Sequence, residues 1–282
     1  MLRTRELTRE FGGLTAVDSV DFDLDPGELC SLIGPNGAGK TTFFDLLTGV
    51  LSPSAGTIEL RRDGEWSDVT DASPHEAANL GLHRSYQITN VFPTSTVLEN
   101  VRVAAQAAGN DSLRVWRNAG SFDSHIEEAH GILNRVGLKR KAGVTARNLS
   151  HGEKRQLEVA IALAGDPDVL LLDEPNAGVS SESVDEIIAL IEDVATDHAV
   201  LLVEHNMEVV MNVSDRIVVL NQGAVIADDR PEGVRDDPAV QEAYLGGYEP
   251  GAGAAASDDA ANPEGSVASE SSGRSNTPEG EA

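Results

Sequence analysis

A glycine-rich stretch followed by a lysine and a threonine is the strongest chemical signal in the sequence. It reads Gly34-Pro35-Asn36-Gly37-Ala38-Gly39-Lys40-Thr41-Thr42 and matches the pattern GxxxxGK[ST]. Glycine lets the backbone wrap closely around a phosphate, and the N–H groups at a helix N-terminus bind anions. In this arrangement Lys40 reaches the β- and γ-phosphates of a nucleotide, and the Thr41 hydroxyl ligates Mg²⁺. The stretch lies between an expected strand and an expected helix, so we interpret it as a nucleotide site rather than as a turn with a chance lysine.

Two adjacent carboxylates follow a continuous apolar run further along the chain. Residues 169–172 are all apolar and are followed directly by Asp173, Glu174 and Pro175. A buried strand over this run carries Asp173 to the C-terminal edge of a sheet, where open α/β folds bind ligands. There Asp173 can hold Mg²⁺ through water, and Glu174 can polarise a water that attacks a γ-phosphate. A plain strand end and turn is the alternative, and the phosphate-binding stretch favours the catalytic interpretation.

The third motif is Leu149-Ser150-His151-Gly152-Glu153, which opens an expected helix that runs to Leu163. Ser150 and Glu153 have the spacing of a capping box, which simply starts a helix. A capped helix N-terminus with a glycine that permits close approach is also an anion site, so both interpretations can hold.

The elements that must position these groups follow from hydrophobic periodicity. Residues 20–25 alternate apolar and acidic, which is typical of a strand with one buried face. Residues 28–33 form the next expected strand, so the glycine-rich stretch directly follows a strand. Residues 40–48 are expected to be a helix that ends at Gly49. An edge strand is expected at 58–61.

The rest of the chain predicts helices and buried parallel strands. Apolar residues at three- and four-residue spacing predict an inserted helical segment from about Val97 to Val136. Continuous apolar runs at 169–172 and 199–203 are typical of parallel strands buried on both faces. A crossover helix at 187–194 joins them into a β-α-β unit. Residues 217–226 are expected to form a terminal hairpin.

Composition limits the class of protein. Asp and Glu number 47 against 21 Lys and Arg in 282 residues, which gives a net charge of −26. This charge argues against nucleic-acid binding, because affinity for a phosphate backbone comes mainly from Lys and Arg. The acidic excess resembles that of proteins from salt-accumulating microbes, since concentrated salt screens its self-repulsion.

No stretch approaches the roughly 20 apolar residues that span a bilayer, and Cys30 is the only cysteine, which excludes a disulfide framework.

In their order along the chain, the phosphate loop, Gln87, Leu-Ser-x-Gly-Glu, Leu-Leu-Leu-Asp-Glu-Pro and Glu204-His205 resemble the ATP-binding subunit of ABC transporters. The resemblance covers roughly residues 2–248. It implies an ATPase with ATP and Mg²⁺ as cofactors. It also implies an α/β fold: a P-loop NTPase core with a parallel sheet, an N-terminal antiparallel β-subdomain and an inserted helical subdomain. We expect the ATP-binding domain at 1–249 and the helical subdomain at about 92–160.

Residues 250–282 lie outside this resemblance. They are mostly Gly, Ala, Ser, Pro and acids, with Val267 as the only large apolar residue. Such a segment cannot bury enough surface to offset its ordering entropy, so we expect a disordered acidic tail.

Position by position, the resemblance implies further roles. Phe11 matches the aromatic residue that stacks on adenine, with an ordinary core phenylalanine as the alternative. Gln87 matches the glutamine that contacts Mg²⁺ and the attacking water. Ser150 and Gly152 match residues that contact the γ-phosphate held by the opposite subunit, which implies a head-to-tail dimer with ATP between the subunits. His205 matches the switch histidine that hydrogen-bonds the γ-phosphate.

Two positions depart from the family pattern. His151 stands where the family usually has glycine, although Ser150 and Gly152 are present beside it. Ser180 stands where many members carry an aspartate that helps to couple the two subunits. Of the roles that the resemblance implies, communication across the dimer interface is therefore the one that this sequence matches least.

The finer resemblance is to importers of branched-chain amino acids. Its marks are the motif at 149–153, the long stretch after Asn100 and the ending at 237–246. Urea and short-amide importers are similar at the same places and remain the alternative. The resemblance implies a homodimer, or a heterodimer with a second ABC ATPase, on two membrane permease subunits. It further implies an indirect link to an extracellular solute-binding protein, no nucleic acid, and a peripheral location at the cytoplasmic face of the plasma membrane.

Two other classes of function remain as rivals. One is a soluble ABC ATPase that serves translation or DNA repair. Those usually carry two cassettes or a long coiled coil, whereas this sequence has one phosphate loop and no heptad run. The other is a regulator that binds ATP without hydrolysing it, and the joint presence of Glu174, Gln87 and His205 argues against it.

Overall fold

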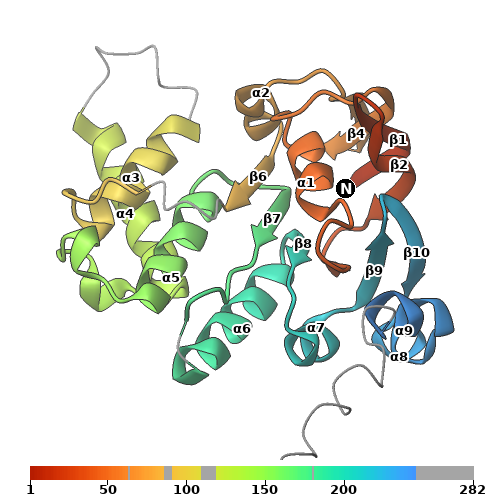
Figure 1. Ribbon diagram of the computed structural model, residues 1–282. Helices are drawn as coiled ribbons and strands as arrows, with labels where there is room; N and C mark the ends of the chain where they lie inside the picture. The colour runs from red at the N-terminus through yellow and green to blue at the C-terminus, as the bar shows by residue number, and fades with distance from the viewer. Residues whose placement is uncertain (63, 86–90, 109–118, 180, 246–282) are drawn as a thin grey trace, which may run out of the picture. The chain divides into compact units, whose positions relative to one another are not determined.

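The computed structural model describes residues 1–62, 64–85, 91–108, 119–179 and 181–245 (Figure 1). Its larger sheet has six strands in the order β10-β9-β3-β8-β7-β6. In that order the strands are β10 (Ala224–Asp229), β9 (Arg216–Asn221), β3 (Leu29–Ile33), β8 (Ala199–Val203), β7 (Val169–Asp173) and β6 (Leu82–Ser85). All neighbours are parallel except β9 and β10, which form the hairpin expected at 217–226.

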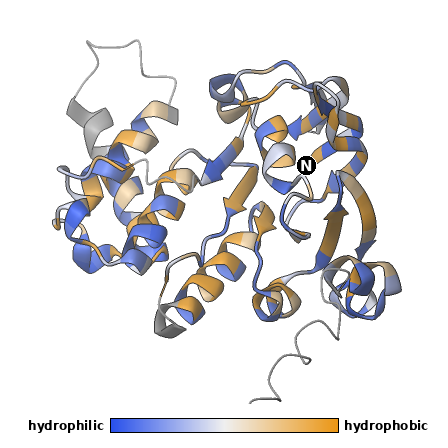
Figure 2. Cartoon of the chain, in the orientation of Figure 1, coloured by the Kyte–Doolittle hydropathy of each residue, from blue (hydrophilic) through white to orange (hydrophobic). Residues whose placement is uncertain are grey.

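The strands β3, β7 and β8 are buried at every residue, and for β7 and β8 this confirms the burial predicted from the apolar runs at 169–172 and 199–203. The sheet register pairs Val203 of β8 with Leu32 of β3 on one side and with Asp173 of β7 on the other. The carboxyl ends of β3, β8 and β7 therefore meet at one edge of the sheet. Figure 2 shows β7 and β9 as hydrophobic along most of their length.

Nine helices lie in the described residues. They are α1 (Lys40–Leu47), α2 (Pro74–Asn79), α3 (Val97–Ala108), α4 (Ala119–Arg135), α5 (His151–Leu163), α6 (Ser181–Ala195), α7 (Met207–Val213), α8 (Pro231–Asp236) and α9 (Pro238–Leu245), with 3₁₀ turns η1 (Lys139–Lys141) and η2 (Ala146–Asn148). Of these, α1 and α6 pack on opposite faces of this sheet. The helices expected at 40–48, 97–136, 151–163 and 187–194 are confirmed. The helices α2, α7, α8 and α9 are too short to give a clear period and were not predicted.

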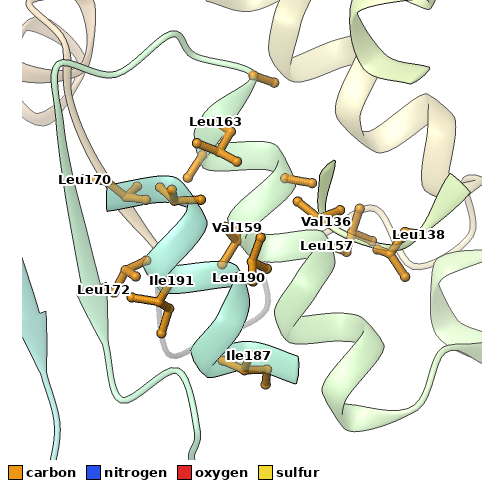
Figure 3. Packing of buried hydrophobic residues seen from close by; sticks show 14 of the residues in the cluster. Val136, Leu138, Leu157, Val159, Leu163, Leu170, Leu172, Ile187, Leu190 and Ile191 are labelled. Carbon is orange, nitrogen blue, oxygen red and sulfur yellow. The ribbon is translucent and has the colours of Figure 1, made fainter. Parts of the chain in front are cut away.

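Alternate residues of β7 face two different hydrophobic clusters. Leu170 and Leu172 pack in one cluster with buried residues of α5 and α6, among them Ile191 (Figure 3). Val169 and Leu171 belong to the other cluster, which contains residues of α1 and of the smaller sheet. The crossover helix α6 and the phosphate-loop helix α1 are thus held by opposite faces of the same strand.

The smaller sheet is antiparallel, with the strand order β2-β1-β4-β5. Its strands are β1 (Leu2–Phe11), β2 (Leu14–Leu24), β4 (Ala55–Arg62) and β5 (Glu65–Asp68). The edge strand expected at 58–61 is wrong in its position, because β4 lies between β1 and β5. Every residue of β5 is exposed, so its sequence shows no apolar alternation that could have revealed the true edge.

The helical segment before the third motif is tied to its neighbours by apolar packing and by backbone hydrogen bonds. Val97 and Val101 of α3 and Leu133 of α4 are buried in the same cluster as Leu157 of α5. The backbone N–H of Val97 donates to the carbonyl of Val144 at 2.9 Å. In the part of the chain that the structure describes, no helix combines the length and the apolar character that crossing a bilayer requires.

The Leu172→Ala variant tests whether β7 is fixed by packing on the face that it shares with α5 and α6. Leu172 is fully buried, so the variant should lose about 2–5 kcal/mol of unfolding free energy through lost burial and a residual cavity. The Val50→Ala control, at a position that is 49% exposed, should change it by about 0.5 kcal/mol or less. Urea denaturation of both variants makes the comparison, and equal losses would contradict the packing described here.

Candidate nucleotide site

The glycine-rich loop leaves β3 at Ile33 and enters α1 at Lys40. Gly34, Gly37 and Gly39 have φ angles of 153°, 80° and 106°, in the region that side chains disfavour. A Cβ at Gly39 would collide with the carbonyl oxygen of Ala16, and one at Gly34 with that of Leu220. Glycine is therefore required at both positions by the close approach of neighbouring backbone.

The start of α1 is arranged to bind an anion. Gly39 is the N-cap residue, and among the described residues no side chain caps the helix, so the first N–H groups are not satisfied in that way. Lys40 lies inside the loop, where its Nζ donates to the carbonyls of Gly34 at 2.6 Å and Pro35 at 3.1 Å. Burial lowers the pKa of the Lys40 ammonium, and the carboxylates of Glu174 and Asp173 partly oppose the shift.

A cleft of about 740 Å³ opens over this loop, which is the size of pockets that hold ligands as large as a nucleotide. Its walls come from the smaller sheet, the loop, α1, the ends of β7 and β8, and the turn between β9 and β10. The lining residues are Phe11, Leu14, Thr15, Ala16, Asn36, Gly37, Ala38, Gly39, Lys40, Thr41, Thr42, Asp173, Glu174, Val203 and Gln222. The cleft thus brings together most of the site residues expected from the first two motifs.

Phe11 lies at the rim of the cleft and is 43% exposed. This exposure excludes the alternative of an ordinary core phenylalanine. The Arg9 guanidinium lies 4.6 Å from the centre of the Phe11 ring and covers one face of it. A flat apolar ring at the rim of a cleft over a glycine-rich loop can stack on a planar base.

Asp173 ends β7 and is only 6% exposed. Its Oδ2 accepts a hydrogen bond from Nη2 of Arg84 at 2.6 Å, and Nη1 of the same guanidinium donates to Oδ1 of Asp45 at 2.6 Å. Arg84 comes from β6 and Asp45 from α1. Because charged partners make the strongest hydrogen bonds, the Asp173 carboxylate is held by a neighbouring strand and indirectly by the phosphate-loop helix.

Glu174 has a φ of 47°, a left-handed conformation that is unusual for a residue with a side chain. Its N–H donates to the Val203 carbonyl at 2.9 Å, and its own carbonyl accepts from the N–H of Ala177 at 3.0 Å. Backbone strain of this kind persists where surrounding structure fixes it and is concentrated at functional sites. The conformation turns the chain sharply at the sheet edge, immediately after Asp173.

His205 lies two residues after the end of β8 and beside Glu174. Its Nδ1 is 3.9 Å from Oε1 of Glu174, and its side chain is 71% exposed. The preceding residue, Glu204, is 1% exposed and accepts hydrogen bonds from the N–H of Asn176 at 3.1 Å and of His205 at 3.2 Å. A buried carboxylate thus links the segment after Glu174 to the segment that carries His205.

The third motif is a helix N-terminus, as predicted. Ser150 is the N-cap of α5, its Oγ accepts from the N–H of Glu153 at 3.3 Å, and its own N–H donates to Oε2 of Glu153 at 2.9 Å. The described residues that line the cleft include none from α5 or its cap. The structure therefore does not bring Ser150 and Gly152 to the phosphate loop of their own chain.

Gln87 and Ser180 lie outside the described residues, as does the tail at 250–282. Sequence reasoning missed Arg84, Gln222 and Glu204 as parts of the site. Gln222 lies in the turn of the hairpin expected at 217–226, but only the strand order brings it to the phosphate loop. Arg84 could be found only from the pairing of β6 with β7.

Comparison with protein families gives two matches. The family described as ABC transporter matches residues 17–177, and the family described as Branched-chain amino acid ATP-binding cassette transporter matches residues 224–250. The High-affinity branched-chain amino acid transport ATP-binding protein LivG of Escherichia coli (strain K12) is 39% identical over 255 residues, which cover 87% of this chain and 98% of LivG. BraF of Pseudomonas aeruginosa, which bears the same description, is 40% identical over 257 residues, with the same coverage of both chains.

Solved structures agree with the sequence relatives. The ADP conformation of MJ1267, an ATP-binding cassette of an ABC transporter, has a TM-score of 0.74 and 27% identity, covering 87% of this chain and 98% of its own. A nucleotide-free ATP-binding cassette from an ABC transporter has a TM-score of 0.73 and 27% identity, covering 86% and 98%. Since the fold, the cleft and the sequence relatives agree, the chain belongs to the ABC transporter family as an ATP-binding, ATP-hydrolysing subunit.

Proposed function

We propose that this chain powers an ABC importer that takes up branched-chain amino acids. The support for the solute is the naming of LivG and BraF at 39% and 40% identity, together with the family match at 224–250, which spans β10, α8 and α9. The transported solute does not contact an ATPase subunit. The residues of the nucleotide cleft therefore do not indicate which solute is transported. A urea or short-amide importer is the alternative, and a soluble non-transport ABC ATPase is a weaker one.

The observation that carries the catalytic proposal is the meeting of the phosphate loop, Asp173 and Glu174 in one cleft. In our proposal, residues 34–42 surround the β- and γ-phosphates with backbone N–H groups, and Lys40 compensates their charge. Phe11 stacks on the adenine ring. The position of the Lys40 ammonium inside the loop, where it donates to two loop carbonyls, supports this proposal.

The donor groups in the cleft fit Mg²⁺. Thr41 supplies a hydroxyl oxygen and Asp173 a carboxylate oxygen, and both residues line the cleft. Mg²⁺ prefers oxygen ligands and keeps several waters, so a few protein oxygens together with the nucleotide suffice to bind it. We propose Thr41, Asp173 and Gln87 as the residues that hold it. When bound, the ion neutralises charge on the phosphates during transfer.

For hydrolysis we propose that Glu174 orients the attacking water and accepts its proton. His205, with its Nδ1 at 3.9 Å from the Glu174 carboxylate, hydrogen-bonds the γ-phosphate on the same side of the cleft. Gln87 contacts the water from the segment after β6. Lys40 and the N–H groups of the loop stabilise the charge that develops in the transition state.

The site is half of a composite site in our proposal, because Ser150 and Gly152 are absent from the described lining of the cleft in their own chain. A second copy in a head-to-tail pair brings its α5 N-terminus to the γ-phosphate. The partner is this chain again or a second ABC ATPase. Binding of ATP then closes the pair and drives two permease subunits, which respond to an extracellular solute-binding protein.

We further propose that residues 1–249 are the ATP-binding domain and that the inserted helical part, at about 92–160, docks on a permease. This attachment makes the chain a peripheral protein of the cytoplasmic face of the plasma membrane. Residues 250–282 are proposed to be a solvated acidic appendage, and the overall acidity an adaptation to concentrated salt.

The Glu174→Gln variant tests the catalytic base. It keeps the size of the side chain but cannot accept the proton of water, so ATP turnover should fall by about 10²-fold or more while ATP affinity stays near that of the wild type. Glu192→Gln, at an exposed position of α6, is the matched control and should keep full turnover. Phosphate release and equilibrium ATP binding measure the two effects. Full turnover in Glu174→Gln would refute the role of this carboxylate.

Mixing two inactive variants tests the composite site. Lys40→Met inactivates the loop half and Ser150→Arg the helix half, so each variant alone should be inactive. Random pairing makes about half of the dimers mixed, each with one intact site of two, and the mixture should regain roughly a quarter of wild-type ATPase activity.

The matched control for this experiment is a mixture of Lys40→Met and Glu174→Gln. Both residues lie on the same half of the site, so every mixed dimer has two damaged sites and no activity should return. Recovery in this control, or no recovery with Ser150→Arg, would contradict a head-to-tail pair made of two copies of this chain.

A further inference from the structure

Arg84 connects three parts of the nucleotide site. The residue lies on β6, its side chain is only 8% exposed, and its two terminal nitrogens each pair with a different carboxylate at 2.6 Å. One carboxylate is Asp45 of α1, the helix that begins with the phosphate-binding Lys40. The other is Asp173 at the end of β7. Arg84 also comes directly before the segment that contains Gln87.

The geometry of a guanidinium explains why this residue type suits the position. Its planar fork presents N–H donors in fixed directions, so a single side chain can bind two carboxylates without rotating between them. The ring of Phe44, 5.4 Å from the guanidinium carbon, borders the group. The parallel pairing of β6 with β7 places Arg84 opposite Leu171, two residues before Asp173.

The ion pair also selects one oxygen of Asp173. Oδ2 accepts the hydrogen bond from Arg84, and Oδ1, which takes no part in this ion pair, can serve a metal ion or its bound water. Groups that bond to metal ligands fix the ligand's orientation, and their loss typically weakens metal binding by about 10- to 100-fold. The same guanidinium holds Asp45, so one side chain joins the metal-side carboxylate to α1.

We propose that Arg84 is a positioning residue for Mg²⁺-dependent ATP binding: it orients the Asp173 carboxylate and ties it to the phosphate-loop helix through Asp45. This inference rests on the proposed function, because it assumes that Asp173 serves the metal ion. A purely structural ion pair is the competing explanation, since removing one member of a buried pair also destabilises a fold.

Arg216 provides a matched control for the structural explanation. It bridges two carboxylates in the same manner, with Nε at 2.6 Å from Oε1 of Glu28 and Nη1 at 2.8 Å from Oδ1 of Asp228. Its side chain is 22% exposed. It begins β9 and pairs with Cys30 near the start of β3, which is the end of the sheet away from the phosphate loop.

The test uses the full chain in a Glu174→Gln background, so that ATP is bound but not consumed. ATP affinity is measured by calorimetry with excess Mg²⁺ and again with EDTA, and the ratio of the two affinities is the Mg²⁺-dependent gain. Thermal unfolding is recorded for every variant. The variants are Arg84→Met, Arg84→Lys and Arg216→Met.

We expect Arg84→Met to keep the affinity measured in EDTA and to lose about tenfold or more of the Mg²⁺-dependent gain. Arg84→Lys should recover part of the gain, because an ammonium keeps the charge but is a poorer bridge between two carboxylates. Arg216→Met should lower the unfolding temperature and leave the gain unchanged.

A wild-type gain in Arg84→Met, with only a lower unfolding temperature, would show that Arg84 is structural and would overturn the inference. If Arg84→Met does not fold, the Arg84→Lys variant is used instead. An undiminished Mg²⁺-dependent gain in ATP affinity in that variant overturns the inference. If the Glu174→Gln chain with native Arg84 shows no Mg²⁺-dependent gain, the proposed role of Asp173 fails instead.

Discussion

The arrangement of the site depends on the burial of the central parallel sheet on both faces. Every residue of β3, β7 and β8 is buried, so the polar groups that follow these strands can emerge only where the strands end. Parallel strands end at the same edge, and the three ends deliver the phosphate loop, Asp173 with Glu174, and His205 to one place. Hydrophobic packing on both faces of the central sheet therefore brings segments that are far apart in the sequence together at one cleft.

Charge at this edge is balanced locally in a chain whose net charge is −26. Asp173 and Asp45 share Arg84, while Lys40 lies within the loop near Glu174 and Asp173. Asp173 can thus stay buried, and Asp45 partly buried, beside a site for an anionic ligand, because the Arg84 guanidinium lies between them. The left-handed Glu174 and the buried Glu204 add backbone order to the same edge, so position and charge are determined together.

The sequence was sufficient for elements whose pattern is local. The apolar runs at 169–172 and 199–203, the capping box at Ser150 and the glycines of the loop each carry their own physical signature. Contacts between distant segments were not predictable in this way: the ion pairs of Arg84 join β6, α1 and β7, and Gln222 reaches the loop only through the strand order. The exposed strand β5 has no burial pattern at all, and for that reason β4 was mistaken for an edge.

The central claim is that the loop of one copy faces the α5 N-terminus of another across ATP, and thiol crosslinking tests it most directly. Asn36 and His151 are exposed, and burial raises the pKa of the Cys30 thiol, which keeps the native cysteine unreactive. Asn36→Cys and His151→Cys chains are mixed in the Glu174→Gln background with a short bifunctional thiol reagent. The account predicts a crosslinked dimer that requires ATP and both variants. Absence of that dimer with ATP, or the same yield from either variant alone, would contradict it.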